Sequence, residues 1–132
     1  MAKKNILDEQ LKRALADYQN LKKRVEGERL EFVKYVLEQF LAKLLPALDG
    51  LEAAQTHLND QGLDLAIKQL KTVFEEEAVK EMNLLNQPFD PKLAECVEII
   101  PGVKDAVIEI TQKGYLLNDK VLRPARVKVG KG

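Results

Sequence analysis

Several residue types are scarce in this 132-residue chain, and each shortage excludes a class of protein. Tryptophan is absent and aromatic residues make up only 5% of the sequence, which argues against a large globular core. A single cysteine, Cys96, excludes an internal disulfide and is typical of a reducing compartment. Because Cys96 lies in a stretch that reads as a strand, we expect its thiol to be buried and inert.

Catalytic and metal-binding patterns are also missing. The one histidine, His57, has no cysteine or second histidine nearby that would complete a metal site. The sequence has neither a glycine-rich phosphate loop nor a Gly-x-Ser-x-Gly turn. We therefore predict a protein that is not an enzyme and uses no cofactor or metal.

No apolar run approaches the ~20 residues of a membrane-spanning helix, and the chain does not open with a signal peptide. These absences predict a cytoplasmic protein that does not contact membranes. The 21 basic and 21 acidic residues balance, so no overall field attracts nucleic acid. Locally, residues 75–98 are acidic and residues 113–132 are basic. The basic segment is either a docking face or a set of solvated strand edges.

What the sequence does contain is a long apolar repeat. From residue 7 to residue 35, apolar side chains recur at alternating steps of four and three, interrupted by Glu28. This spacing predicts one long helix whose apolar stripe faces a partner helix in a coiled coil. A chain this small has no core to cover such a helix, so we expect a homodimer. The predicted dimer contacts are Leu7, Leu11, Tyr18, Leu21, Val25, Phe32, Leu48, Leu51 and Leu70.

Helical spacing continues beyond the coiled coil. Pro46 predicts that the long helix ends or kinks near Leu44-Leu45. Apolar positions then indicate a short helix up to about residue 58 and another from Leu63 to Phe74, separated by Asn59-Asp60-Gln61-Gly62. Two such hairpins, one from each copy, would form a four-helix bundle.

The period changes to two after Pro88. Val97 and Ile99 flank Glu98, and similar pairs occur at 108/110 and 127/129, which indicates half-buried strands. Pro101-Gly102 and Asn118-Asp119 are expected to separate them. The predicted fold class is α+β with three segments: a dimerising helix at 1–45, a helical hairpin at 46–86 and a small all-β domain at 87–132.

Some local motifs predict specific structural features. Phe89-Asp90-Pro91 predicts a turn, with Phe89 packed at the junction of helix and sheet. Gly114 predicts a backbone position where a side chain would obstruct, and Tyr115 an aromatic ring packed on the sheet. Asp49 is expected either to cap a helix or to stay solvated.

Three motifs together resemble the GrpE family of nucleotide exchange factors for DnaK-type chaperones. The motifs are Leu44-Leu45-Pro46 with Asp49 and Leu51, Phe89-Asp90-Pro91, and Gly114-Tyr115 followed by Asp119, Leu122, Arg123, Pro124 and Ala125. The chain departs from the family pattern at Ala94, where histidine is usual, and at Cys96, where alanine is usual. It also has Ala78 in place of a glycine. Since alanine is the better helix former, we expect the last helix to extend further than usual.

The resemblance implies a co-chaperone of the stress response and protein folding. It implies a dimer whose β domain opens the ATPase cleft of a DnaK-type chaperone and releases ADP, with adenine nucleotide touched only through the chaperone. The residues that it implies for chaperone binding are Gly114, Tyr115, Asn118, Arg123 and Pro124 in the β domain and Asn20 and Arg24 on the long helix. We expect the Arg123 fork to face outward beside Pro124, with a role in holding the sheet together as the alternative.

Two other functions fit parts of the sequence. A coiled-coil scaffold or holdase would use the helices alone and would not need the β domain. A nucleic-acid binder would use the basic residues 113–132, but that segment lacks the interleaved aromatic residues on which bases stack.

Overall fold

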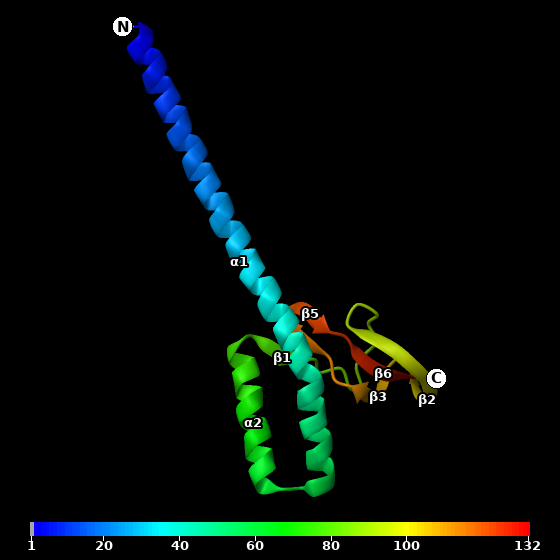
Figure 1. The fold of residues 1–132 in the computed structure, drawn as a ribbon. Coiled ribbons are helices and arrows are strands. Elements are labelled where there is room, and N and C mark those ends of the chain that lie inside the picture. The colour runs from blue at the N-terminus through cyan, green and yellow to red at the C-terminus, as the bar shows by residue number, and fades with distance from the viewer. Residues whose placement is uncertain (1) are drawn as a thin grey trace. The chain divides into compact units, whose positions relative to one another are not determined.

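The computed structural model describes residues 2–132 and has the predicted α+β fold class (Figure 1). Two helices precede six short strands. The chain divides into two units, Met1–Phe40 and Leu41–Gly132, and each is described by itself. Helix α1 (Ala2–Leu58) contributes to both units, whereas helix α2 (Gln61–Glu76) and all six strands belong to the second.

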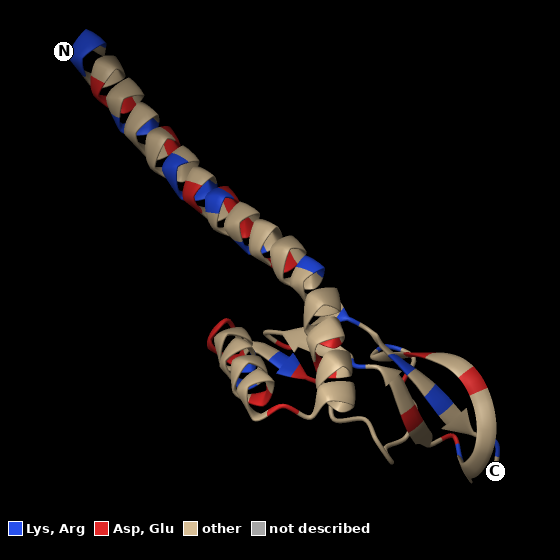
Figure 2. Cartoon of the chain, turned by 60° about the horizontal axis from the view of Figure 1, so that its bottom comes forward, with Lys and Arg blue, Asp and Glu red and all other residues tan. Residues whose placement is uncertain are grey.

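Residues 2–40 of the first unit are helical and carry the predicted apolar stripe on their surface. Along it, lysines and arginines alternate with acidic residues (Figure 2). Its stripe residues are between 48% and 67% exposed; they include Leu7, Leu11, Tyr18, Leu21, Val25 and Phe32. Side chains of this kind gain little free energy from folding of a single chain, because they stay in water. The stripe is therefore an unpartnered surface of this chain.

Of the two outcomes predicted near Leu44-Leu45, an end or a kink of the long helix, the end is wrong, because α1 continues through Pro46 to Leu58. A proline inside a helix removes one backbone hydrogen bond and crowds the preceding turn. Here the surrounding turns carry Leu41, Leu45 and Leu48, which are the buried residues of α1. Burial of three leucines contributes several times the free energy of one hydrogen bond, so packing holds the helix together across the proline.

The helical hairpin has the predicted second helix and a shorter turn than expected. Asn59 takes a left-handed backbone conformation, with φ of 48°, and Asp60 caps α2 by accepting a hydrogen bond from the Gly62 backbone N–H at 3.2 Å. The prediction that Ala78 lengthens the last helix is wrong. Helix α2 ends at Glu76, and Ala78 follows it with φ of 63°, the conformation in which glycine usually terminates a helix.

The strands form two three-stranded sheets in the second unit. The first sheet has the order β1-β4-β5 and is antiparallel; its strands are β1 (Val79–Glu81), β4 (Tyr115–Leu117) and β5 (Lys120–Arg123). The second has the order β2-β6-β3, with strands β2 (Ala94–Lys104), β6 (Ala125–Gly130) and β3 (Val107–Gln112). Strand β6 is central, parallel to β2 and antiparallel to β3.

A small apolar core holds the second sheet. Its buried members are Met82, Leu84, Ala94, Val107, Ala125, Val127 and Val129, and Phe89 packs against them. Phe89 is placed by the predicted Phe-Asp-Pro turn, in which Asp90 accepts a hydrogen bond from the Lys92 backbone N–H at 2.9 Å. The turn therefore brings one aromatic ring onto the β core.

Strand β2 departs from three expectations. Val97 and Ile99 are 47% and 66% exposed rather than half-buried, and the Cys96 thiol is exposed rather than buried. Pro101-Gly102 lies within β2 instead of ending it. The register against β6 shifts between Cys96 and Glu98 and again after Ile100, so simple alternation does not assign the faces.

Across residues 2–132, no helix is both long and apolar enough to span a membrane.

Candidate functional site

The predicted binding residues of the β domain lie around strands β4 and β5. Gly114 directly precedes β4, and Tyr115 pairs with Arg123 across the β4–β5 ladder. Asn118 is at the opposite end of this hairpin, in the turn predicted at Asn118-Asp119, and is exposed. Pro124 is exposed between β5 and β6. The structure thus brings Gly114, Tyr115 and Arg123 together and leaves Asn118 apart from them.

Gly114 is buried where a side chain would obstruct the fold, as the sequence predicted. A Cβ atom there would lie 2.6 Å from the backbone nitrogen of Ala125 and 2.6 Å from the Met82 sulfur. The Gly114 carbonyl accepts a hydrogen bond from the Met82 backbone N–H at 2.9 Å. Gly114 therefore permits the first sheet to pass close to the second, and offers no side chain to a partner.

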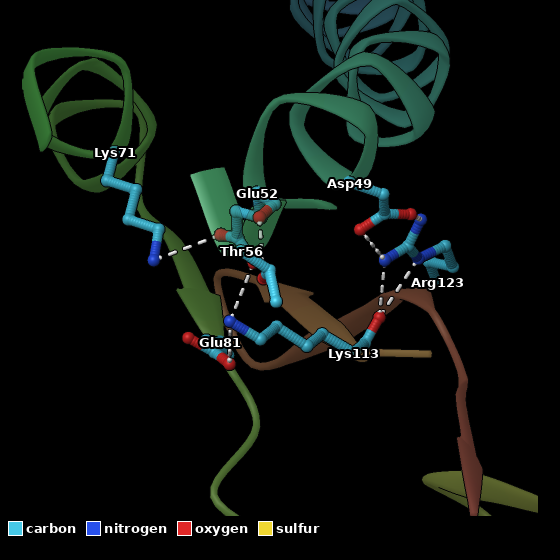
Figure 3. Close-up of polar contacts among 7 residues, drawn as sticks. All are labelled: Asp49, Glu52, Thr56, Lys71, Glu81, Lys113 and Arg123. Carbon is cyan, nitrogen blue, oxygen red and sulfur yellow. Dashed lines mark hydrogen bonds and ion pairs between the residues drawn. The ribbon is translucent and has the colours of Figure 1, made fainter. Parts of the chain in front are cut away.

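The prediction that the Arg123 fork faces outward is wrong. The Arg123 side chain is only 13% exposed, and its two terminal nitrogens donate to the Asp49 carboxylate at 2.5 and 3.0 Å (Figure 3). Arg123 also donates to the Lys113 carbonyl oxygen, from Nε at 3.0 Å and from Nη2 at 2.6 Å. The guanidinium carbon lies 5.4 Å from the centre of the Tyr115 ring. Because the planar guanidinium group donates to both the Asp49 carboxylate and the Lys113 carbonyl, these bonds fix its orientation.

A second group of charges lies beside this fork. Glu52, on α1, accepts a hydrogen bond from Lys113 Nζ at 2.7 Å and lies 3.0 Å from Lys71 Nζ on α2 (Figure 3). Lys113 Nζ is also 3.5 Å from the carboxylate of Glu81 on β1. The two lysines therefore link α1 to α2 and to the first sheet.

The environment of these groups changes their pKa values. Burial alone would raise the pKa of Glu52, but the hydrogen bonds from Lys113 and Lys71 outweigh it and hold the pKa below its ordinary value. Burial likewise opposes the charge of Lys113, yet Glu52 and Glu81 raise its pKa. Both groups are therefore held in their charged forms.

Tyr115 lies beside these charges, and its hydroxyl group has a raised pKa and no hydrogen-bond partner in the described chain. Burial, followed by the nearby carboxylates of Glu52 and Glu81, raises the pKa of Tyr115 well above its ordinary value. Its hydroxyl is buried and has no hydrogen-bond partner within residues 2–132. With 4% of its surface exposed, Tyr115 presents almost nothing to a partner.

The helical candidates fall into exposed and buried groups. Asn20 and Arg24 are exposed on the first unit, where Arg24 Nε lies 3.9 Å from Glu28. Among the predicted dimer contacts in the second unit, Leu51 is 38% exposed, Leu70 is intermediate and Leu48 has no exposed surface. Leu48 therefore packs inside its own chain, because it lies on the side of α1 that covers the cleft lined also by Phe74 and Tyr115.

Sequence reasoning missed two features. It left Asp49 as a cap or a solvated residue and did not single out Glu52, although the two carboxylates are three residues apart and so share a helix face. It also missed three exposed apolar side chains on β2, those of Val97, Ile99 and Val103, which are 47%, 66% and 74% exposed. We call these three residues the β2 patch. Apolar side chains grouped on an edge strand are typical of a protein-binding surface.

In the described part of the chain, no three histidine, cysteine or acidic side chains gather as a metal site would require. The geometry is instead that of a charged joint between helix and sheet, with an apolar patch on the neighbouring sheet.

Comparison with known proteins identifies the family. The GrpE family model matches residues 1–131. The chain belongs to the GrpE family. Among similar curated proteins, Protein GrpE of Polaromonas sp. is 36% identical over 97% of this chain and 74% of its own length. Protein GrpE of Hydrogenovibrio crunogenus is 38% identical over 89% and 69%, and that of Carboxydothermus hydrogenoformans is 40% identical over 90% and 66%.

The three positions at which the chain departs from the GrpE pattern have different surroundings in the structure. Ala94 is 5% exposed in the β core, Cys96 is exposed on β2, and Ala78 is in the left-handed conformation. Only the change at Ala78 places a side chain in a backbone conformation that disfavours it. The chain therefore has a strained joint between α2 and β1 at this position.

Proposed function

We propose that this protein is a co-chaperone that acts as the nucleotide exchange factor of a DnaK-type chaperone, opening its ATPase cleft so that ADP leaves. The observation that carries the proposal is the match of the GrpE family model to residues 1–131. Such a function requires no catalytic residue of its own. It requires a surface that binds the open cleft more tightly than the closed one.

Thermodynamic linkage sets the size of the effect. Each ~1.4 kcal/mol of preference for the open cleft weakens ADP binding tenfold, and nucleotide weakens binding of the exchange factor equally. The β2 patch gives the β domain an apolar surface for this contact, with Asn118 and Pro124 exposed on the neighbouring elements. Asn20 and Arg24 are additional candidates on the helix. The proposal includes a cytoplasmic, reducing setting, in which the exposed Cys96 stays a free thiol.

The proposed assembly is a homodimer paired along the apolar stripe of α1. The stripe side chains are exposed in the single chain, and pairing would remove them from water. In this proposal, residues 1–45 dimerise, residues 46–86 form the bundle and residues 87–132 contact the chaperone. Leu21→Glu would place a charge in the seam and should shift the protein toward monomer in light scattering at micromolar concentration. A wild-type monomer at that concentration would rule out the assembly.

The decisive experiment measures release of fluorescent ADP from a DnaK-type chaperone. We expect the full chain to accelerate release in proportion to its concentration, up to saturation. The exposed stripe also favours a second candidate, a coiled-coil scaffold or holdase. That protein would bind unfolded substrates or assemble other chains, and would leave the rate of ADP release unchanged.

A further inference from the structure

The joint between α1 and the first sheet has both apolar and charged side chains. A cleft of about 430 Å³ is lined by the buried residues Leu48 of α1, Phe74 of α2, Val79 of β1 and Tyr115 of β4, together with the charged residues Lys71, Glu75, Lys80 and Glu81. Close packing of the buried side chains contributes to fixing the sheet against the helix. The charged contacts beside the cleft are candidates for a further hold on the orientation of the sheet.

The strongest candidate is the two-sided contact of Arg123. Its fork holds Asp49 of α1 with two hydrogen bonds and holds the Lys113 carbonyl, between β3 and β4, with two more. Four bonds from one planar group constrain direction as well as distance, which a single lysine contact does not. Arg123 therefore ties one carboxylate of the helix to the end of β5 and the start of β4.

Glu52 supplies a second point of attachment three residues along the helix. It binds Lys113, whose carbonyl is already held by Arg123, and also pairs with Lys71 of α2 (Figure 3). One attachment would leave the sheet free to pivot, whereas two attachments on the same helix face oppose rotation. The side chains of Arg123 and Glu52 are 13% and 19% exposed, and those of their partners Asp49 and Lys113 are 35% and 38% exposed, so water and salt screen these pairs in part.

We propose that Asp49, Glu52, Lys113 and Arg123 form an ionic latch that fixes the orientation of sheet β1-β4-β5 on α1. Asp49 and Glu52 are then positioning residues, which act on a partner only through the sheet that they hold. The part of this inference that concerns partner activity rests on the proposed function: a β domain held in one direction transmits force to the ATPase cleft, and a pivoting one does not.

Orientation is measured directly by the distance between two spin labels in the full chain. In a Cys96→Ser background, one label is attached to Lys80→Cys, an exposed position of β1, and the other to Ala53→Cys, an exposed position of α1 in the same unit. Labelled chains are diluted into an excess of unlabelled Cys96→Ser chains, so that only distances within one chain are recorded. We expect a narrow distribution for the wild-type latch. Asp49→Asn with Glu52→Gln should broaden or shift it, and Arg123→Lys should give an intermediate width.

The matched control is Asp64→Asn, which removes the exposed pair with Lys68 on α2. It should leave the distribution unchanged. A folded double variant, Asp49→Asn with Glu52→Gln, that keeps the wild-type distribution would overturn the latch. If the double variant does not fold, the single variants Glu52→Gln and Arg123→Lys are measured instead, and folded single variants that both keep the wild-type distribution overturn the latch equally.

The exchange assay separates failure of the latch from failure of the proposed function. Asp49→Asn with Glu52→Gln should lower the maximal rate of ADP release roughly tenfold, the effect of about 1.4 kcal/mol, while the half-saturating concentration changes little. Mere loss of folded protein would instead raise the half-saturating concentration. Full exchange by a variant with a broadened distribution would refute the link to activity. No acceleration by the wild-type chain would refute the proposed function and leave the distance result standing.

Discussion

The backbone N–H of Asn118 donates a hydrogen bond to the carbonyl oxygen of Ala78 at 3.2 Å, which joins two residues in the left-handed conformation. Ala78 has φ of 63° and Asn118 has φ of 48°. Asparagine tolerates this conformation, whereas alanine does not. At this end of the β1–β4 pair, Asn118 is therefore suited to the left-handed conformation, whereas Ala78 destabilises it.

Ala78→Gly should stabilise the protein. Glycine removes the clash between the Cβ atom and the backbone, a gain of about 1 kcal/mol in the free energy of unfolding. Thermal and denaturant unfolding would measure it. Ala78→Val should lower the stability, since β-branching increases the same clash. Equal stability of the three proteins would show that the α2–β1 joint carries no strain.

Gly114→Ala should destabilise the fold by about 1–3 kcal/mol, because the new methyl group meets the backbone of Ala125. The matched control is Gly50→Ala on α1, where, in the described chain, no atom other than those of adjacent residues and the nearby helix backbone lies within 4 Å of the added methyl. That change should raise the stability by about 0.5–1 kcal/mol through helix propensity. Denaturant unfolding of both variants measures the change in stability. A Gly114→Ala variant as stable as the wild type would contradict the close approach of Gly114 to the Ala125 backbone.

Stability should depend on the charge of Glu52 in acid. The pKa of Glu52 is lower in the folded protein than its ordinary value of 4.5, so its contribution is present above that value and is lost as the pH falls through the folded-state pKa. We expect Glu52→Gln to lower the melting temperature at about pH 7, and we expect this difference to shrink as the pH falls below 4.5 and through the folded-state pKa of Glu52. A stability difference that does not change with pH would assign Glu52 a packing role instead.

Ile99→Asp should weaken chaperone binding with little loss of stability. Ile99 is 66% exposed in the β2 patch, so the change removes apolar surface that a partner would cover and adds a charge that binding would bury. Titration of exchange activity should show a half-saturating concentration raised roughly tenfold or more, consistent with a cost above about 1.4 kcal/mol. The control, Leu65→Asp, changes a similarly exposed residue on α2. Identical titrations for both variants would exclude the β2 patch from the interface.

The parts of the fold that depend on local pattern could be predicted from the sequence. The apolar stripe, the second helix and the Asn118-Asp119 turn all follow from residues close together in the chain. The end of α1 could not be predicted from Pro46 alone, because burial of Leu45 and Leu48 compensates for the missing hydrogen bond. Tertiary packing is not visible in a local rule.

The site was harder to predict for the same reason. Arg123 meets a carboxylate 74 residues away, and no local feature of Arg123-Pro124 identifies Asp49 as its partner. On β2, the irregular register against β6 places Ile99 in solvent, although its alternation with Glu98 indicates burial. Family resemblance gave the functional class, but the direction of each side chain required the structure.

The strand order β2-β6-β3 has a consequence for how the protein is made. Strands β2 and β3 leave the ribosome first, yet their hydrogen-bonded neighbour in the sheet is β6, which is synthesised after both. During translation they have no partner for their ladders, and the apolar side chains Val97, Ile99 and Val103 emerge in the same interval. A nascent co-chaperone with this order would itself expose the kind of segment that chaperones bind.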